Sequence, residues 1–386
     1  MKEKTKIHFP YSKPYIDKKD IKAVYEVLTN GYLTQGQRLT DFEKLLKKTF
    51  KSNYALACNS GTAALHMIYR ALNVGPEKSV LITPITFLST ANAAKMCGAK
   101  VYFSDGDKKT GCMDPNSAEQ ILKKYPNISV IVVVHLCGRV ENVEEISKLA
   151  KKYNCKLVED ACHAPGSSFK NKKGETVFTG SCKYSVASSF SFHAIKHIAV
   201  GEGGCITTNN SSIFKKIKNY RSHGMIRGNI NKWEYKMYDL GWNYRLDEIS
   251  CALGISQISK LTKGIEKRRE LVKTYKSYLE EYEYINLPDE PEFSNSHSWH
   301  LFSIQIDFIN LNKNRLKVMK KLSSFGVGTQ IHYKPIFLQP YYSNNLQKKN
   351  ALEYYNKTLS LPLYPELKKK EVKFICETLI KVLGLK

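Results

Sequence analysis

Short apolar runs alternate with helix-length segments between residues 54 and 207, and this alternation limits the fold more than any other feature of the chain. Strands separated by helices predict a largely parallel sheet with helices over both of its faces. We therefore expect an α/β protein with about seven mostly parallel strands, which bind ligands at their carboxyl ends. The runs are Tyr54–Cys58, Val80–Ile82, Val101–Phe103, Val130–Val134, Leu157–Val158, Val186–Phe192 and Cys205–Thr207.

A change of pattern past Gly241 predicts a second, smaller unit. Residues 246–261 and 263–284 have the spacing of helices, and a strand-like run at residues 299–306 precedes a last helix at 372–383. We expect an N-terminal segment with a large domain over residues 1–255. A connecting helix and a small α/β domain would follow over residues 256–386.

The strongly basic charge permits several classes of partner. The formal net charge is +25, with 60 Lys+Arg against 35 Asp+Glu. These lysines are spread almost evenly, and the chain carries no nucleic-acid fold signature. We interpret the charge as a lysine-rich surface that also attracts a phosphorylated substrate, and we expect neither nucleic acid nor a membrane as partner. A non-catalytic nucleic-acid-binding or regulatory protein is the remote alternative, and the charge is its only support.

The ten cysteines are scattered and include no Cys-x-x-Cys pair. A zinc site or a disulfide framework is therefore not expected, and no other metal site is predicted. Free thiols of this kind are typical of cytoplasmic proteins, so we expect this compartment.

Lys196 is the first candidate for chemistry. It follows a buried strand and precedes Gly201-Glu202-Gly203-Gly204. Partial burial lowers the pKa of a lysine and makes its amine nucleophilic enough for Schiff-base formation. Taken alone, the same lysine is far better interpreted as a solvated residue in a turn, and only the rest of the sequence favours chemistry.

Three other strand ends carry polar or aromatic groups. Ser60, Gly61 and Thr62 open a helix, where backbone N–H groups and hydroxyls bind phosphate or simply cap the helix. Asp160 ends an apolar strand, where a carboxylate is costly unless a cation meets it, although a capping role is the alternative. Phe87 follows a proline turn and either stacks on a flat ring or belongs to the core.

These motifs together resemble the DegT/DnrJ/EryC1/StrS family of sugar aminotransferases, over nearly the whole chain. The resemblance implies the aspartate-aminotransferase fold (fold type I), pyridoxal 5′-phosphate as cofactor with its pyridoxamine form in the half-reaction, and a homodimer with shared active sites. The matching segments are Asn59-Ser60-Gly61-Thr62, Glu159-Asp160-Ala161-Cys162-His163-Ala164, Ser191-Phe192-His193-Ala194-Ile195-Lys196 and Gly201-Glu202-Gly203-Gly204.

The resemblance also implies a role for each matching residue. Lys196 would bind the cofactor as a Schiff base and carry the proton. Asp160 would pair with the pyridine nitrogen, and His163 would lie near the phenolic oxygen or the face of the ring. Phe87 would stack on the ring. The phosphate would be held by Ser60, Gly61, Thr62 and Ser191, with Asn243 supplied by the neighbouring subunit.

Four further segments resemble the 4-aminotransferases of pseudaminic acid synthesis. They are Pro10-Tyr11-Ser12, Leu33-Thr34-Gln35-Gly36, Tyr220-Arg221-Ser222-His223-Gly224-Met225 and Gln330-Ile331-His332-Tyr333-Lys334-Pro335. This implies glutamate as amine donor and a UDP-linked 2-acetamido-2,6-dideoxy-4-hexulose as acceptor. Another nucleotide 3- or 4-ketosugar, of perosamine or dTDP-sugar type, is the alternative. The implied contacts to the nucleotide sugar are Tyr11, Gly31, Tyr32, Leu33, Thr34, Ser60, His332, Tyr333, Lys334 and Pro335.

Overall fold

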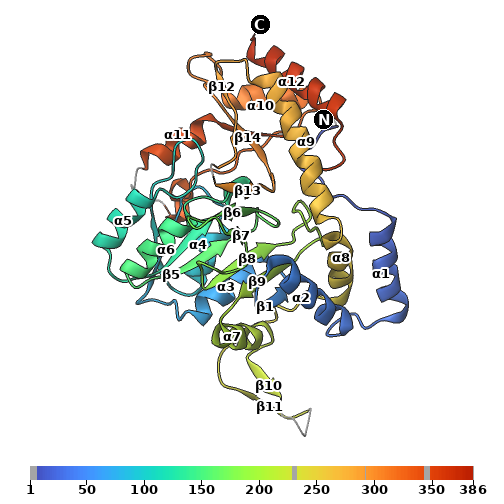
Figure 1. Cartoon of the computed structure of the whole chain (residues 1–386), viewed down its shortest axis with the longest axis vertical. Coiled ribbons are helices and arrows are strands. Elements are labelled where there is room, and N and C mark those ends of the chain that lie inside the picture. Colours follow the sequence, from blue (N-terminus) through green and yellow to red (C-terminus); the bar gives the residue numbers. More distant parts are fainter. Residues whose placement is uncertain (1–6, 228–232, 292, 343–347, 386) are drawn as a thin grey trace.

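The computed structural model describes residues 7–227, 233–291, 293–342 and 348–385. Its centre is a seven-stranded sheet in the order β1-β9-β8-β5-β4-β2-β3 (Figure 1). Pairing is parallel from β3 across to β8, whereas β9 is antiparallel to both of its neighbours. The strands are β1 Tyr54–Cys58, β2 Ser79–Ile82, β3 Lys100–Phe103, β4 Ile128–Val134, β5 Lys156–Asp160, β8 Ala187–Ser191 and β9 Gly204–Thr208. These are the seven runs expected from the sequence, and the predicted fold class is confirmed.

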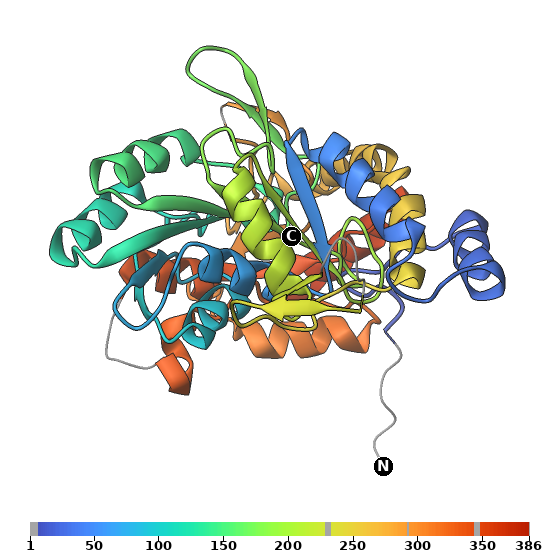
Figure 2. The same ribbon diagram turned by 90° about the horizontal axis from the view of Figure 1, so that it is seen from below.

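Both faces of the sheet are covered, which explains why the central strand β4 is almost continuously apolar rather than alternating. Val130 and Val132 face the layer that contains α3 and α4, while Ile131 and Val133 pack in the layer of α5 and α6. In the view from below, α5 and α6 lie at one side of the sheet and α1 at the opposite end (Figure 2). The helices of this domain are α2 Gln37–Phe50, α3 Gly61–Ala71, α4 Ser89–Met96, α5 Pro115–Lys124, α6 Val143–Lys152, α7 Ser211–Arg221 and α8 Glu248–Ile258.

The small domain has its own core around a three-stranded antiparallel sheet in the order β12-β14-β15. The long helix α9, Leu261–Leu279, runs from the large domain into it (Figure 1). Its other elements are β12 Ile285–Asn286, β14 Phe302–Ile306, α10 Arg315–Ser324, α11 Lys349–Lys357, β15 Thr358–Leu361 and α12 Lys369–Leu383. A side sheet combines β6 Ser168–Lys170, β7 Thr176–Phe178 and β13 Ser294–Ser296, and single turns lie at η1 Leu136–Gly138, η2 Ile336–Leu338 and η3 Pro340–Tyr342.

Two details bear on the division into domains, which stays a proposal. The expected boundary at residues 255 and 256 falls inside α8, because the helix continues without interruption to Ile258. The first described residues also lie against the small domain, since the backbone N–H groups of His8 and Phe9 donate to the carbonyl of Gly326. We therefore propose that the large domain begins after this segment and ends between α8 and α9.

Two segments lie at the periphery of the molecule, although the first of them packs against α8 (Figure 1). The first is α1, Lys18–Asn30, whose N-terminus is capped by Asp17 through the backbone N–H groups of Lys19 and Asp20. Its residues Ile21 and Leu28 are 63% and 58% exposed, although the sequence gives them a shared apolar face with buried Val27. The second is the hairpin of β10 Met225–Arg227 and β11 Tyr235–Met237, which projects beyond α7.

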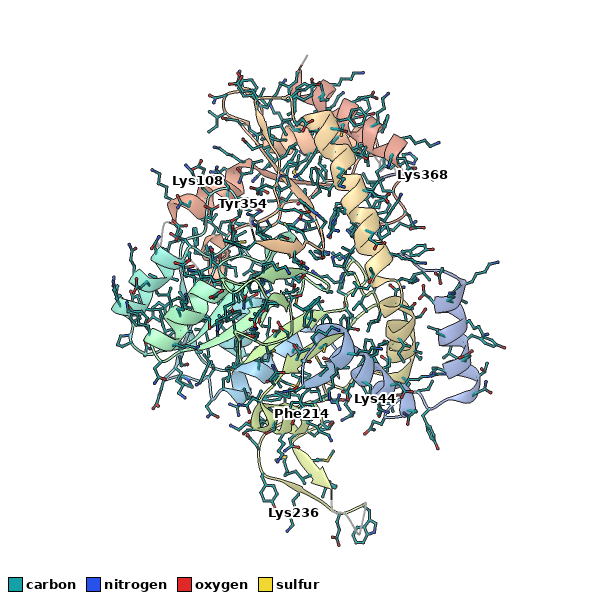
Figure 3. The ribbon with its side chains drawn as sticks, viewed as in Figure 1. Lys44, Lys108, Phe214, Lys236, Tyr354 and Lys368 are labelled. Carbon is teal, nitrogen blue, oxygen red and sulfur yellow. The ribbon has the colours of Figure 1, made fainter. Side chains whose placement is uncertain are left out.

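The surface carries its lysines on all sides. Lys44, Lys108, Lys236 and Lys368 are exposed and lie on four separate parts of the molecule (Figure 3). Among the described residues, no helix combines the length and apolarity needed to cross a membrane.

Candidate active site

A cavity of about 650 Å³ opens at the carboxyl ends of the parallel strands. The ends of β5 and β8 reach it with Asp160 and Ser191, and the loop after β1 reaches it with Ser60. This is the edge at which ligands bind in sheets of this type. The predicted residues that line it are Tyr11, Ser60, Gly61, Thr62, Phe87, Asp160, His163, Ser191, Lys196, His332, Tyr333 and Lys334.

Lys196 reaches the cavity from a turn that follows β8. Its backbone N–H donates to the carbonyl of His193, and His193 bridges to Gly201, whose φ of +92° suits glycine. Burial lowers the pKa of the Lys196 amine, while the Asp160 carboxylate acts in the opposite direction. An amine of this kind loses its proton more readily than a surface lysine does, which is what Schiff-base chemistry requires.

Asp160 is 5% exposed and is held by neutral donors. The Thr90 hydroxyl donates to Oδ2 at 2.8 Å, and the Thr86 hydroxyl lies 2.9 Å from that of Thr90. The backbone N–H of Cys162 donates to Oδ1 at 3.3 Å. These donors fix the orientation of the carboxylate without neutralising its charge, so the charge can stabilise a cationic group in the cavity.

The turn at Ser60 and Gly61 forms an anion seat. Ser60 caps α3, since its Oγ accepts from the backbone N–H of Ala63 at 3.0 Å, and its own O–H is left to donate. A side chain on Gly204 would come within 2.5 Å of the Ser60 backbone, so only glycine lets β9 approach this turn. The helix N-terminus, with the hydroxyls of Ser60, Thr62 and Ser191 nearby, suits a phosphate group.

His163 and Phe87 present aromatic surface to the same cavity. His163 Nδ1 accepts from the backbone N–H of Cys137 at 3.3 Å, so its proton is on Nε2, which lies 3.1 Å from the Tyr333 hydroxyl. Burial keeps the pKa of His163 well below its usual value. Because both ring nitrogens have protein partners, His163 offers its ring face to a ligand. Phe87 is 58% exposed, which leaves its ring free to stack.

Tyr11 of the N-terminal segment and residues 330–334 form another wall of the cavity. The rings of Tyr11 and His332 lie 5.4 Å apart, and His332 Nδ1 is 2.8 Å from the Ser360 hydroxyl. Lys334 is exposed on this wall. Pro335 is buried and does not line the cavity, because the chain turns into η2 at that point.

Besides Pro335, five predicted residues lie outside this cavity. Gly31 and Tyr32 line a separate cavity between α1 and α2, and Leu33 and Thr34 are exposed beside it. Asn243 is exposed, and its carbonyl accepts from the Asn59 side chain at 3.3 Å. A single chain therefore does not bring these five residues to Lys196.

Two residues that contact the charged groups of the cavity escaped the sequence analysis. Thr90, which holds Asp160, follows Thr86 by four residues at the start of α4, and this spacing is a usable signal. His300 Nε2 lies 3.4 Å from Lys196 Nζ. Its signal is a histidine within the apolar run Trp299-His300-Leu301-Phe302, a position that the sequence assigned to a strand of the small domain.

The fold and the cavity define a class of protein: an aminotransferase of the aspartate-aminotransferase fold that uses pyridoxal 5′-phosphate. A buried amine, a hydrogen-bonded carboxylate, two aromatic faces and a helix N-terminus match the aldehyde, the pyridine nitrogen, the ring and the phosphate of that cofactor. The group fits the residues present. More particularly, the chain belongs to the DegT/DnrJ/EryC1/StrS aminotransferase family, whose sequence profile matches residues 14–380.

Individual relatives agree with this assignment. The UDP-4-amino-4,6-dideoxy-N-acetyl-beta-L-altrosamine transaminase of Campylobacter jejuni is 38% identical over 377 residues, which is 97% of each chain. The structure of Helicobacter pylori PseC, an aminotransferase of pseudaminic acid biosynthesis, superposes with a TM-score of 0.90 at 32% identity, over 97% of this chain and 99% of that one. The putative sugar aminotransferase Spr1654 of Streptococcus pneumoniae, solved in its PMP form, gives 0.88 at 25% identity, over 98% and 99%.

Proposed function

We propose that this chain transfers the amino group of L-glutamate to the 4-keto carbon of a UDP-linked 2-acetamido-2,6-dideoxy-4-hexulose of β-L-arabino configuration. The product is UDP-4-amino-4,6-dideoxy-N-acetyl-β-L-altrosamine, a step of pseudaminic acid biosynthesis in the cytoplasm. The observation that carries the proposal is one cavity lined by a buried amine at Lys196 and a hydrogen-bonded carboxylate at Asp160. The names of the relatives support the choice of sugar, and ten free cysteines support the compartment.

The cofactor pyridoxal 5′-phosphate, when bound, supplies an aldehyde that exchanges amino groups and a ring that withdraws electrons. In our proposal Lys196 holds it covalently between turnovers, and Asp160 keeps its ring nitrogen protonated. Ser60, Thr62, Ser191 and the N-terminus of α3 bind its phosphate. His163 and Phe87 pack against the ring.

Lys196 also moves the proton in each half of the reaction. Its amine, released from the cofactor, lies within the same cavity and has a pKa lowered by burial. A base whose pKa is closer to the working pH exchanges protons faster in both directions. The same amine can therefore take a proton from the donor and deliver one to the sugar carbon.

The sugar nucleotide would extend toward the wall formed by Tyr11 and residues 330–334. Tyr11, His332 and Tyr333 offer aromatic surface and hydrogen-bonding groups there, and the exposed ammonium of Lys334 suits the diphosphate. A cavity of about 650 Å³ has room for a sugar beside the cofactor ring. We propose that the uridine lies beyond this cavity, toward a neighbouring subunit.

A homodimer is part of the proposal. Ile21 and Leu28 of α1 are exposed, as are Tyr238 and Leu240 after the projecting hairpin. Exposed apolar surface of this extent is typical of subunit interfaces. A partner chain would supply Asn243 to the phosphate and the Gly31–Thr34 segment to the sugar nucleotide. Light scattering on the purified protein should give about twice the chain mass of 44.1 kDa.

Incubation of the purified protein with glutamate and a panel of UDP-, dTDP- and GDP-linked 3- and 4-ketosugars tests the function. We expect 2-oxoglutarate and a 4-amino sugar with the UDP-linked L-arabino substrate, and at most weak turnover with the others. Preferred turnover of a dTDP- or GDP-ketosugar would move the assignment to another substrate within the family. No consumption of glutamate with any ketosugar would contradict the proposal.

A further inference from the structure

Three imidazoles, those of buried His163 and His300 and of half-buried His197, lie together beside Lys196. The rings of His163 and His197 lie 4.4 Å and 5.4 Å from the ring of His300. His300 is 1% exposed, and its Nε2 lies 3.4 Å from Lys196 Nζ. The lysine amine therefore has an imidazole neighbour on the side of the small domain.

His300 is the imidazole that contacts this amine, although His197 Nε2 also has no hydrogen-bond partner among the described residues. Both nitrogens of His163 are engaged, one by the backbone N–H of Cys137 and the other by the Tyr333 hydroxyl. His332 Nδ1 lies against the Ser360 hydroxyl. Among the residues that the structure describes, His300 is the histidine with a ring nitrogen in contact with the Lys196 amine.

The backbone holds the His300 ring in place from two sides. The backbone N–H of His300 donates to the carbonyl of Cys137 at 2.9 Å, and the backbone carbonyl of His300 accepts from the buried Arg268 side chain at 3.1 Å. The preceding residue, Trp299, has a φ of +50° and is 2% exposed. A ring anchored to both domains in this way is a fixed reference point for a flexible lysine side chain.

The donor and acceptor roles follow from the chemistry of the pair. An ammonium group has three donors and no acceptor, so a protonated Lys196 donates and His300 Nε2 accepts. The ring proton is then on Nδ1, a buried atom with no partner among the described residues. Since Nδ1 has no acceptor to pass a proton to, this imidazole can hold the ammonium but cannot relay its proton onward.

From this geometry we propose that His300 is a positioning residue for Lys196. Whenever the lysine is not bound to the cofactor, His300 Nε2 accepts a hydrogen bond from its ammonium group and keeps the amine in place for proton transfer. The proposal rests on the proposed function, because it concerns the amine that this function uses. It differs from general acid–base catalysis, because His300 itself neither gains nor loses a proton.

The proposal makes a prediction about the amine itself. The groups that face Lys196 are the carboxylate of Asp160, the thiols of Cys137 and Cys162, and four imidazoles, those of His163, His197, His300 and His332. Loss of the His300 acceptor destabilises the charged amine and leaves the other groups unchanged. The pKa of Lys196 should then fall, by roughly one unit for one hydrogen bond to a charged group. A lower pKa makes the free amine more abundant at neutral pH.

The test is the pH dependence of acetylation of Lys196 in the full-length, cofactor-free chain, followed by peptide mass spectrometry. In His300→Leu the midpoint should move down by roughly one pH unit, and Lys196 should react about tenfold faster at neutral pH. His300→Gln places an amide oxygen near the position of Nε2 and should restore most of the wild-type midpoint. His297→Leu is the matched control, because His297 is 3% exposed on the same segment but stacks on Trp299. In this variant the midpoint of Lys196 acetylation should stay at the wild-type value.

Activity supplies the second readout. His300→Leu should lower kcat by about tenfold to a hundredfold with little change in KM, since the amine is misplaced although more of it is unprotonated. General loss of structure would expose the amine and move its midpoint up toward that of a surface lysine, whereas the proposal predicts a lower midpoint together with a slower enzyme. The Gln variant should recover kcat in step with the midpoint.

Two results would overturn the proposal. One is an unchanged acetylation midpoint in His300→Leu, which would indicate that water in the small cavity beside Lys196, His197 and Arg268 holds the amine instead. The other is an equal shift in His297→Leu. If no ketosugar is aminated but the midpoint moves as described, the proposed function fails and the role of His300 stands.

Discussion

The two ends of the cavity hold their charged groups in opposite ways. At one end, Asp160 is the last residue of a central strand, and its two oxygens accept from Thr90 and from the backbone N–H of Cys162. At the other end, Lys196 lies in a turn, and within the described part of the chain its amine has one hydrogen-bonding contact, at 3.4 Å, to His300. The carboxylate is fixed within the large domain, whereas the amine reaches across to the small one.

This difference matches what each group has to do. A carboxylate that keeps a ring nitrogen protonated must stay charged and stay in one place, and hydrogen bonds from neutral donors favour both. An amine that binds a cofactor, leaves it and carries a proton must change both its position and its charge. A single long contact with a neutral imidazole permits that change at low energetic cost.

Replacement of Lys196 removes the reactive amine from the cavity and should have the largest effect on kcat. We expect Lys196→Ala to lose at least about 10⁴-fold in kcat, because both the covalent attachment and the proton transfer are lost. The visible absorbance of the lysine-bound cofactor should also disappear. Steady-state assays and an absorbance spectrum measure the two losses, and substantial retained turnover would refute the assignment.

Asp160→Asn tests the fixed end. The amide keeps the shape of the carboxylate, and its oxygen can still accept the hydrogen bond from Thr90. It removes the negative charge, so kcat should fall on the order of 10²–10³-fold. Cofactor binding, measured by absorbance, should persist. If kcat stays near the wild-type value, Asp160 does not act on the ring nitrogen, and the contrast between the two ends has no functional meaning.

Acid should lower the stability of the fold, because the imidazoles near Lys196 are buried in their neutral form. Burial, with the nearby Lys196 charge, holds the pKa of His300 well below its usual value of about 6.5. Below pH 6.5 the unfolded chain therefore binds a proton that the folded chain refuses, and stability falls as the pH falls. Between pH 7 and pH 5 this residue alone should remove about 2 kcal/mol from the free energy of unfolding.

Urea denaturation of the cofactor-free wild type and of His300→Leu, at both pH values, measures this contribution. The variant should lose about 2 kcal/mol less than the wild type on acidification, if its other buried histidines stay neutral as before. Equal losses in the two proteins would show that His300 is not the group that resists protonation.

Thr90→Val should produce the smallest of the four effects, about tenfold in kcat, because Asp160 keeps its bond from Cys162. Thr378→Val is the control: that hydroxyl is also buried, and it donates to the carbonyl of Phe374 on α12, far from the cavity along the chain. Kinetic assays of both variants should separate loss of carboxylate orientation from loss of a buried hydrogen bond. An effect of similar size in Thr378→Val would contradict the assigned role of Thr90.

The same contrast explains what could be predicted from the sequence. The seven strands follow from their apolar runs, and residues at strand ends, such as Asp160 and Ser191, follow because parallel strands end at one edge. His300 could not be predicted as a neighbour of Lys196, since the two are far apart in the chain and belong to different domains. Thr90 also escaped, because a threonine in the first turn of a helix is commonplace.

Residues on the surface of the chain were also difficult to assign from the sequence. The apolar side of α1 predicts a buried face, yet Ile21 and Leu28 are exposed in one chain. Asn243 and the Gly31–Thr34 segment were assigned to the site, but they lie outside the cavity of their own chain. A pattern within one sequence indicates that a surface is apolar, but not whether its own chain or a second copy covers it.

The most direct test of the account is to reduce the purified, cofactor-loaded protein with borohydride and to map the modified peptide. The account predicts that the phosphopyridoxyl group is on Lys196, and that Lys196→Ala retains none. A label on a different lysine, or no label in the wild type, would contradict the central claim that the turn after β8 carries the reactive amine.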